Sequence, residues 1–142
     1  MGKVKTYDPK KLFISLGSHV VTGYAEGSFI SIEPGDDGTT KKVGCDGEVV
    51  RSISPDRTTK VKLTLLLSSP TVAWCQQQYI KDIETREGTF PVLIRDLIGG
   101  LVYSAEDAWI VKPPVREFDR QAPNREIEID TADAIWEGER WN

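Results

Sequence analysis

The segment 60–67, KVKLTLLL, alternates polar and apolar residues and constrains the fold more than any other part of the chain. Side chains of a β-strand point alternately to opposite faces, so this pattern predicts a strand whose first half is solvated on one face. Leu66 makes the last part apolar on both faces, which predicts that the end of the strand is buried. The apolar face is formed by Val61, Leu63, Leu65 and Leu67, and the polar face by Lys60, Lys62 and Thr64.

Shorter segments with strand character lie on both sides of this one. Small turn-forming residues separate the first three, at the spacing of β-hairpins. The segment 125–130 (REIEID) alternates again, with its isoleucines predicted inside and its charges outside, whereas 104–108 (SAEDA) predicts a bulge or a single helical turn. The predicted strands cover residues 12–16, 19–24, 28–33, 48–54, 90–94, 101–104, 108–112 and 125–130.

One amphipathic helix is predicted, over about residues 70–85. Ser69 can cap the free amides at its start, and Pro70 suits the first helical position because the amide it lacks has no partner there. Apolar residues then recur at helical spacing, so we expect the helix to lie on a sheet. Trp74 and Gln78 are predicted to point outward. The predicted inner face is formed by Val72, Cys75, Tyr79, Ile80 and Ile83.

Residues 34–47, PGDDGTTKKVGCDG, contain four glycines and show no hydrophobic period. This stretch is too short to link domains and too long for a tight turn. With the strand-like residues that follow, it predicts a long loop or hairpin over about 34–54, either an extended arm or two splayed strands with a flexible tip. Such an arm suits an element that becomes ordered only against a partner.

Length and charge exclude several classes of protein. The 142 residues suffice for a single domain, 1–142, with its own core, and the longest apolar run falls well below the ~20 residues of a membrane span. The first residues do not resemble a signal peptide, so we expect synthesis in a cytoplasm. The formal net charge of −4 argues against a basic surface that binds phosphates.

Residues with catalytic or metal-binding chemistry do not form a known motif. His19 is the only histidine, and a dyad with Cys45 or Cys75 stays open because sequence does not supply the geometry. A calcium loop is excluded since Lys41 and Lys42 interrupt the acidic positions. The glycines do not match a phosphate-binding loop. We therefore expect no enzymatic activity, no cofactor and no metal.

The four tryptophans suggest a second possible function. Trp109 lies in an alternating strand and is predicted to be in the core, whereas Trp74 is predicted to be exposed. An exposed tryptophan is typical of a contact surface because it contributes a large area at modest entropic cost. The alternative function is therefore a monomeric β-sandwich module that binds sugar or peptide through Trp74, Trp136 or Trp141.

Several motifs, in order along the chain, resemble the tail tube protein family of contractile-tailed bacteriophages. The likeness covers roughly residues 5–130. Its most specific marks are G-x-D-G-E-V-x-R-S at 44–52, the strand-to-helix junction T-L…S-S-P, and A-W-I-x-K-P-P at 108–114. Phage-like bacteriocins and secretion systems have similar tubes, and the sequence does not distinguish them. The tail 131–142 has no matching feature, and its role is open.

The resemblance implies a β-sandwich or partly open β-barrel with one flanking helix. It further implies that six copies close into a ring and that rings stack into a hollow tube through which phage DNA passes into the host. Implied partners are the chain itself, the tail sheath, tape measure and baseplate hub or terminator proteins; the implied location is the virion tail, after synthesis in the host. DNA would pass without specific binding.

The resemblance also assigns roles to individual residues. The arm would contact the adjacent ring, with Arg51 and nearby acids as candidates for interfacial ion pairs. The helix would lie outside the tube, where Trp74 and Gln78 could contact a sheath. The residues assigned to the subunit interface are Asp36, Asp37, Gly44, Asp46, Gly47, Glu48 and Arg51.

Three physical features of the sequence agree with this assembly. Strands with open edges are a liability in a monomer and are completed by circular closure. The arm 34–54 is a poor loop in a monomer but a good contact between copies. A net acidic protein also suits a wall that must let DNA slide, because phosphates would adhere to a cationic lumen.

Overall fold

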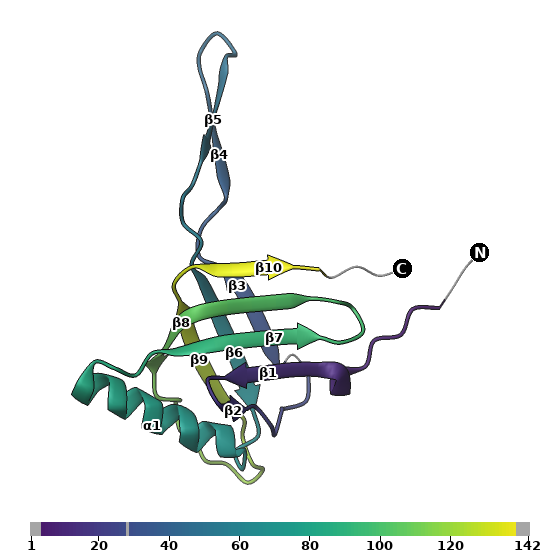
Figure 1. Cartoon of the computed structure of the whole chain (residues 1–142), viewed down its shortest axis with the longest axis vertical. Helices are drawn as coiled ribbons and strands as arrows, with labels where there is room; N and C mark the ends of the chain where they lie inside the picture. The colour runs from purple at the N-terminus through teal and green to yellow at the C-terminus, as the bar shows by residue number, and fades with distance from the viewer. Residues whose placement is uncertain (1–3, 28, 139–142) are drawn as a thin grey trace.

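The computed structural model describes residues 4–27 and 29–138 and shows a strongly bent antiparallel sheet with one helix on it (Figure 1). The sheet order is β2-β1-β7-β8-β9-β6-β3, and β10 pairs with β8 outside this path. The bounds are β1 Leu12–Leu16, β2 His19–Val20, β3 Ile30–Pro34, β6 Thr59–Leu65, β7 Phe90–Asp96, β8 Val102–Lys112, β9 Arg125–Thr131 and β10 Ala134–Glu137, preceded by a 3-10 turn, Pro9–Lys11.

The long strand β8 belongs to both halves of the sheet. Its first half lies between β7 and β10, and its second half pairs with β9. Between the cross-strand pairs Val92–Ala105 and Phe90–Ala108, β8 has one residue more than β7, so a bulge lies at 106–107. A bulge bends a strand and increases its twist. The bulge predicted at 104–108 is therefore confirmed, and it falls where the sheet turns from one half into the other.

The sheet does not close into a barrel, since its path ends at β2 on one side and β3 on the other. The expected fold class, mostly β with a sandwich-like or partly open arrangement and one flanking helix, is confirmed. The core lies inside the bend. It is formed mainly by Ile14, Leu16, Val61, Leu63, Leu65, Val92, Ile94, Tyr103, Ile110, Ile127 and Ile129.

The alternation predicted for 60–67 holds as far as Leu65, the last residue of β6. Leu66 and Leu67 are 44% and 37% exposed, so their predicted burial is wrong. The chain leaves the sheet at this point and turns into the helix, which lifts both side chains off the apolar layer.

The helix α1, Pro70–Thr85, has the predicted bounds. Ser69 caps it by accepting a hydrogen bond from the amide of Thr71, and its hydroxyl donates to the carbonyl of Thr22 at 2.5 Å. At the other end, Arg86 adopts the left-handed conformation with φ 63°. These contacts fix the helix between the end of β6 and the start of β7.

The face that α1 presents to the sheet matches the prediction in part, because Cys75 is buried and Val72 and Tyr79 pack against the core. The buried residues are Thr71 and Cys75, whereas Ile80 and Ile83 are exposed. Trp74 packs on the core, so its predicted outward orientation is wrong. The inner stripe of the helix is rotated relative to the most apolar stripe of the sequence, because packing against β8, β2 and β9 decides which side is covered.

Two further residues lie on unexpected faces. Trp109 is half-exposed and lies outside the core cluster, so its predicted core position is wrong. The bulge shifts the alternation, and its neighbours Ala108 and Ile110 take the inner face. Arg125, predicted to point outward, is 3% exposed and lies over the ring of Phe118, 5.3 Å from its centroid. Strand alternation places Arg125 on the same face as Ile127.

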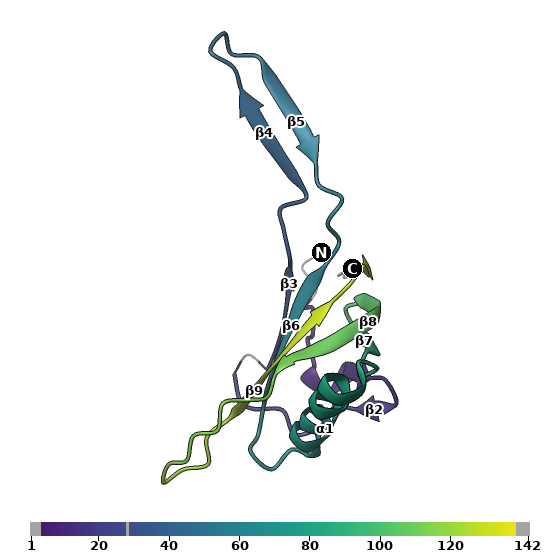
Figure 2. The same cartoon turned by 90° about the vertical axis from the view of Figure 1, so that its left-hand side faces the viewer.

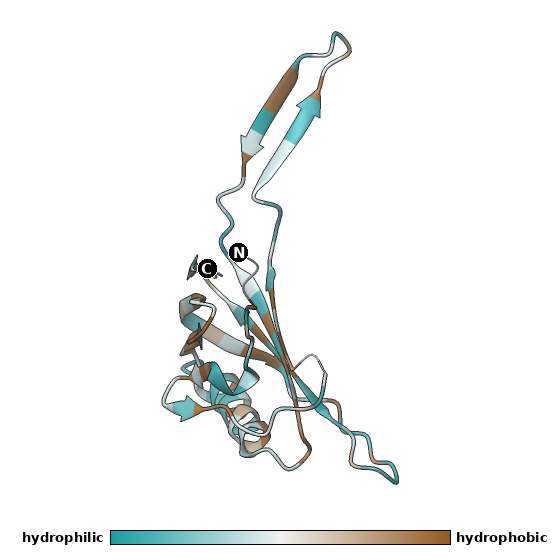
Figure 3. Ribbon diagram, turned by 90° about the vertical axis from the view of Figure 1, so that its right-hand side faces the viewer, coloured by the Kyte–Doolittle hydropathy of each residue, from teal (hydrophilic) through white to brown (hydrophobic). Residues whose placement is uncertain are grey.

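The described part of the chain contains no helix with the length and hydrophobicity that a membrane crossing requires. Figure 3 shows where the hydrophobic residues concentrate, along the strands of the body and on one strand of the projecting arm.

Candidate assembly interface

The arm predicted at 34–54 is a regular β-hairpin that projects from the body along the longest axis of the molecule (Figures 1 and 2). Its strands, β4 Thr39–Val43 and β5 Val49–Ile53, form a two-stranded sheet of their own. All ten residues of the two strands are exposed. An isolated two-stranded hairpin is marginally stable in water, so a hairpin of this length is expected to gain contacts elsewhere.

One face of the hairpin combines apolar and basic side chains. The cross-strand pairs Val43–Val49 and Lys41–Arg51 lie on this face, followed by Thr39–Ile53. Val43, Val49 and Ile53 are 57%, 58% and 66% exposed. Two cations directly opposite each other repel, which destabilises the free hairpin. We call this the basic face; Lys42 lies on the other face.

The tip of the hairpin, residues 44–48, is a closed turn. The amide of Gly44 donates to the carbonyl of Glu48 at 2.7 Å, and Gly47 donates back to Gly44 at 3.0 Å. Asp46 accepts a hydrogen bond from the amide of Glu48 at 3.1 Å. Gly47 has φ +87°, which favours glycine. Four of the assigned interface residues therefore shape one turn, with the exposed Cys45 in it.

The base of the hairpin holds the remaining assigned acids. Asp36 accepts hydrogen bonds from the amide of Asp37 at 2.8 Å and from the hydroxyl of Ser54 at 3.2 Å. Nearby, hydrogen bonds from the hydroxyl and amide of Thr58 lower the pKa of Asp56. These carboxylates stabilise the turns where the hairpin leaves the body. They lie at the opposite end of the hairpin from 44–48, so the assigned residues form a group at each end, with Arg51 between them.

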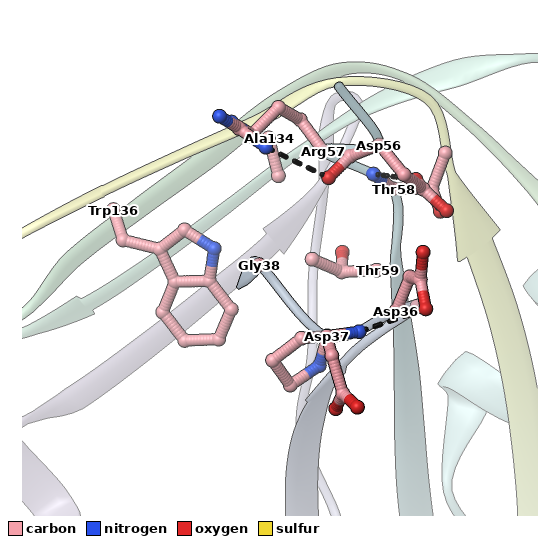
Figure 4. Close-up of a pocket in the computed structure, with 11 residues that line it drawn as sticks. Asp36, Asp37, Gly38, Asp56, Arg57, Thr58, Thr59, Ala134 and Trp136 are labelled. Carbon is pink, nitrogen blue, oxygen red and sulfur yellow. Dashed lines mark hydrogen bonds between the residues drawn. The ribbon is translucent and has the colours of Figure 1, made fainter. Parts of the chain in front are cut away.

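An open groove of about 780 Å³ lies beside the base (Figure 4). Trp136 of β10 forms one wall, and its ring packs edge-on against Tyr103 with centroids 5.1 Å apart. The amide of Ala134 donates to the carbonyl of Arg57 at 3.1 Å, which joins β10 to the base. The sequence did not predict β10, because its four residues are too few to show a period.

Arg51 lies in the middle of the hairpin, and no carboxylate among the described residues lies within ion-pair distance of it. In residues 4–27 and 29–138, the ion pair within 4.0 Å is Lys60–Asp130 at 3.9 Å, and its side chains are partly exposed. An exposed pair of this kind contributes little to stability. The predicted interfacial pairing of Arg51 stays a prediction.

The residues assigned to a sheath contact do not form an outer surface. The ring of Trp74 stacks on His19 at 5.3 Å and packs edge-on against Phe90 at 5.1 Å. Gln78 donates to the carbonyl of Gly88 at 3.2 Å. The outward face of α1 instead presents Ile80 and Ile83.

Among the described residues, no hydrogen bond joins His19 to Cys45 or Cys75. The Nε2 atom of His19 lies 2.8 Å from the hydroxyl of Thr71. Burial raises the pKa of the Cys75 thiol to about 12, which keeps it protonated, and Cys45 lies at the hairpin tip. Within the described ranges, the structure brings no three His, Cys, Asp or Glu side chains together as a metal site.

Comparison with known proteins identifies the architecture. No family model matches the chain. The chain is 26% identical over 133 residues to structural protein ORF10 of Pseudomonas phage KPP10, covering 88% of this chain and 77% of that protein. The tube-terminating cap of the anti-feeding prophage superposes with a TM-score of 0.63 at 9% identity, over 97% of this chain and 95% of that chain. The chain has the fold of contractile injection-system proteins.

Two further structures of this group match similarly. A chain of the extended sheath-tube complex of an extracellular contractile injection system superposes with a TM-score of 0.60 at 13% identity, over 94% of this chain and 92% of that chain. A chain of the sheath/tube terminator of an extracellular contractile injection system superposes with a TM-score of 0.61 at 12% identity. The match covers 96% of this chain and 99% of that chain. The resemblance to contractile tail tube proteins is thus confirmed in its fold.

Proposed function

We propose that this contractile-tail protein is a structural subunit that assembles into stacked hexameric rings, forming the inner tail tube through which DNA passes. The hairpin carries the proposal, because a long, wholly exposed hairpin with an apolar and basic face needs a partner surface. The chain itself supplies that partner. The similarity to a phage structural protein and to injection-system components supports a tail location in the virion and a non-catalytic role.

The open sheet supports closure between copies. The edge strands β2 and β3 lie at the two ends of the sheet path, and β10 adds a third edge. Unpaired backbone groups at an edge form hydrogen bonds readily with another strand. Joining such edges around a ring removes them, as closure does in a barrel.

The solvent face of β3, β6 and β9 suits the lumen. It lies on the side of the sheet away from α1 (Figure 2). Cross-strand register groups four carboxylates on this face with two lysines. An excess of negative charge keeps DNA from adhering. The carboxylates are Glu33, Glu126, Glu128 and Asp130, and the lysines are Lys60 and Lys62.

With the sheet facing the lumen, α1 lies outside, where a contractile sheath surrounds the tube. Ile80 and Ile83 replace Trp74 and Gln78 as the proposed contact there. The tape measure and the baseplate hub or terminator would contact the tube interior and ends. Synthesis takes place in the host cytoplasm before assembly.

Electron microscopy of the concentrated purified protein tests the proposal. We expect rings or tubes for the wild type. In the matched variant, residues 39–53 are replaced by two glycines, which join Gly38 to Ser54, whose backbones are already hydrogen-bonded at 2.9 Å. This variant should keep its melting temperature but lose ring stacking. Normal tubes from it would contradict the role of the hairpin.

A monomeric sugar- or peptide-binding module is the competing function. Trp74 is packed inside, Trp141 lies outside the described residues, and Trp136 lines the groove at the hairpin base. A wild type that stays monomeric at every concentration, even with preformed tube ends as seeds, would favour this function.

A further inference from the structure

The basic face of the hairpin defines what its partner surface must offer. Lys41 and Arg51 lie directly opposite each other, and Val43 and Val49 flank them toward the tip. This face requires carboxylates to offset the repulsion and apolar side chains to cover the valines. Lys42 lies on the other face of the same hairpin and serves as a control for the role of Lys41 and Arg51.

The end of the molecule opposite the hairpin carries both carboxylates and exposed apolar side chains. The loop 113–124 joins β8 to β9 there (Figure 2). A groove of about 250 Å³ lies at its base, and Val115 on its rim is 66% exposed. Phe118 on the same loop is 80% exposed. The groove is lined by Lys112, Val115, Glu117, Asn124, Glu126 and Glu128.

Two of the three carboxylates in this groove lack a compensating charge across the strands. Glu128 lies between Lys62 and Lys112 in the register of the sheet. Glu126 instead faces Thr64, and Glu117 lies on the loop. The guanidinium of Arg125 is turned inward onto Phe118 and does not enter the groove's lining. The loop's other charges, Arg116, Asp119 and Arg120, are exposed and lie outside the lining.

We propose that the groove of Val115, Glu117 and Glu126 receives the basic face of the hairpin from a second copy of this chain. The inference rests on the proposed function and names the surface that its hairpin contacts. Lys41 and Arg51 would meet Glu117 and Glu126, while Val43 and Val49 would cover Val115. Because hairpin and groove lie at opposite ends of the molecule, the contact is head-to-tail and repeats along a stack.

A second hollow that combines acidic side chains with an exposed apolar one lies at the bulge of β8. Glu106 and Asp107 at the bulge of β8 line a hollow with Asp133 and the exposed Ile135. This hollow lies beside β10, on the half of the body nearest the hairpin, so a head-to-tail stack does not bring the next hairpin toward it (Figure 1). It serves as the comparison site in the test.

Charge reversal with complementation tests the assignment. One variant is K41E/R51E and the other is E117K/E126K. Each alone should raise the critical concentration for tube formation by about tenfold or more, because like charges then meet in every contact. Mixed in equal amounts, the two variants can alternate along a stack, where every contact joins opposite charges, so the mixture should form tubes near the wild-type concentration. Light scattering and electron microscopy measure this, and melting curves confirm that the monomers fold.

The controls separate this inference from the proposed function. K42E, on the other hairpin face, should assemble like the wild type. If the wild type forms tubes but the mixture does not, the groove is assigned wrongly while the tube function stands. If E106K/D133K complements K41E/R51E instead, the acceptor is the hollow at the bulge, which overturns the inference. A wild type that never forms tubes overturns both.

Discussion

The hydroxyl of Tyr103 is hydrogen-bonded to the hydroxyl of Thr59, and both side chains are buried beneath the base of the hairpin. The hydroxyl of Thr131 lies 2.7 Å from that of Thr59 and completes a buried group of three. These residues come from β8, β6 and β9. The group therefore joins three strands at the point where the hairpin leaves the body, and it anchors the strand that leads out of the hairpin.

Removal of one hydroxyl from this group should destabilise the body. We expect Tyr103→Phe to lower the free energy of unfolding by about 1–2 kcal/mol, because the buried threonine loses a partner that water cannot replace. Tyr7, which is 56% exposed, provides the control, and Tyr7→Phe should have no effect. Urea denaturation measures both. Equal stability of Tyr103→Phe and wild type would show that the group does not stabilise the fold.

Alanine substitutions at two glycines with similar backbone conformations separate the cost of backbone strain from the cost of a steric clash. Gly23 and Gly27 have φ of +75° and +79°, but a Cβ on Gly23 would lie 2.7 Å from the Cβ of Ser69, whereas one on Gly27 meets nothing within 4 Å. We expect Gly27→Ala to cost about 1 kcal/mol and Gly23→Ala about 2 kcal/mol more. Thermal unfolding of both variants measures the difference. Equal effects would mean that Ser69 and the helix start move aside.

The two faces of α1 should respond differently to truncation. Trp74→Ala removes a ring packed between His19 and Phe90 and should cost about 3 kcal/mol. Ile83→Ala removes a side chain that is 66% exposed and should change stability by less than about 0.5 kcal/mol. Denaturant melts compare the two. A larger loss for Ile83→Ala would place the inner face of the helix where the sequence pattern predicted it.

Alkaline pH should weaken the fold. Burial raises the pKa of Cys75 from 9.0 and that of Tyr24 from 10.0, both to about 12. Above pH 9 the unfolded chain loses the thiol proton while the folded chain keeps it, so the free energy of unfolding falls as pH rises toward 12. The slope approaches about 1.4 kcal/mol per pH unit for one proton. Cys75→Ala should flatten the slope between pH 9 and 10, and an unchanged slope would exclude the thiol as its source.

Thiol labelling should report assembly at the hairpin tip. In the free subunit, a maleimide should react fast with the exposed Cys45, and with the buried Cys75 only after denaturation. In tubes, the Cys45 rate should fall about tenfold or more if the tip is covered by the next ring. Cys45→Ser is the control for background labelling. An unchanged rate in tubes would place the tip outside the contact.

Local patterns in the sequence determined where most elements begin and end. The alternation in 60–67 located β6, because a pleated strand turns successive side chains to opposite faces. The Ser69-Pro70 start located α1, since both residues satisfy needs of a helix terminus. The lack of a hydrophobic core pattern in 34–54 marked an arm outside the body, and the family resemblance assigned seven of its residues to the candidate interface.

Tertiary structure alone decided which faces are covered and which side chains meet. Trp74 lies inside and Ile83 outside, because the helix orientation depends on strands far away in the sequence. The opposition of Lys41 and Arg51 follows from the hairpin register, which a glycine-rich tip leaves undetermined in the sequence. Burial of Arg125 and pairing of β10 likewise depend on distant contacts. The hydrophobic periodicity of a helix or strand indicates that its two faces differ. Only packing against segments remote in the sequence decides which face is buried.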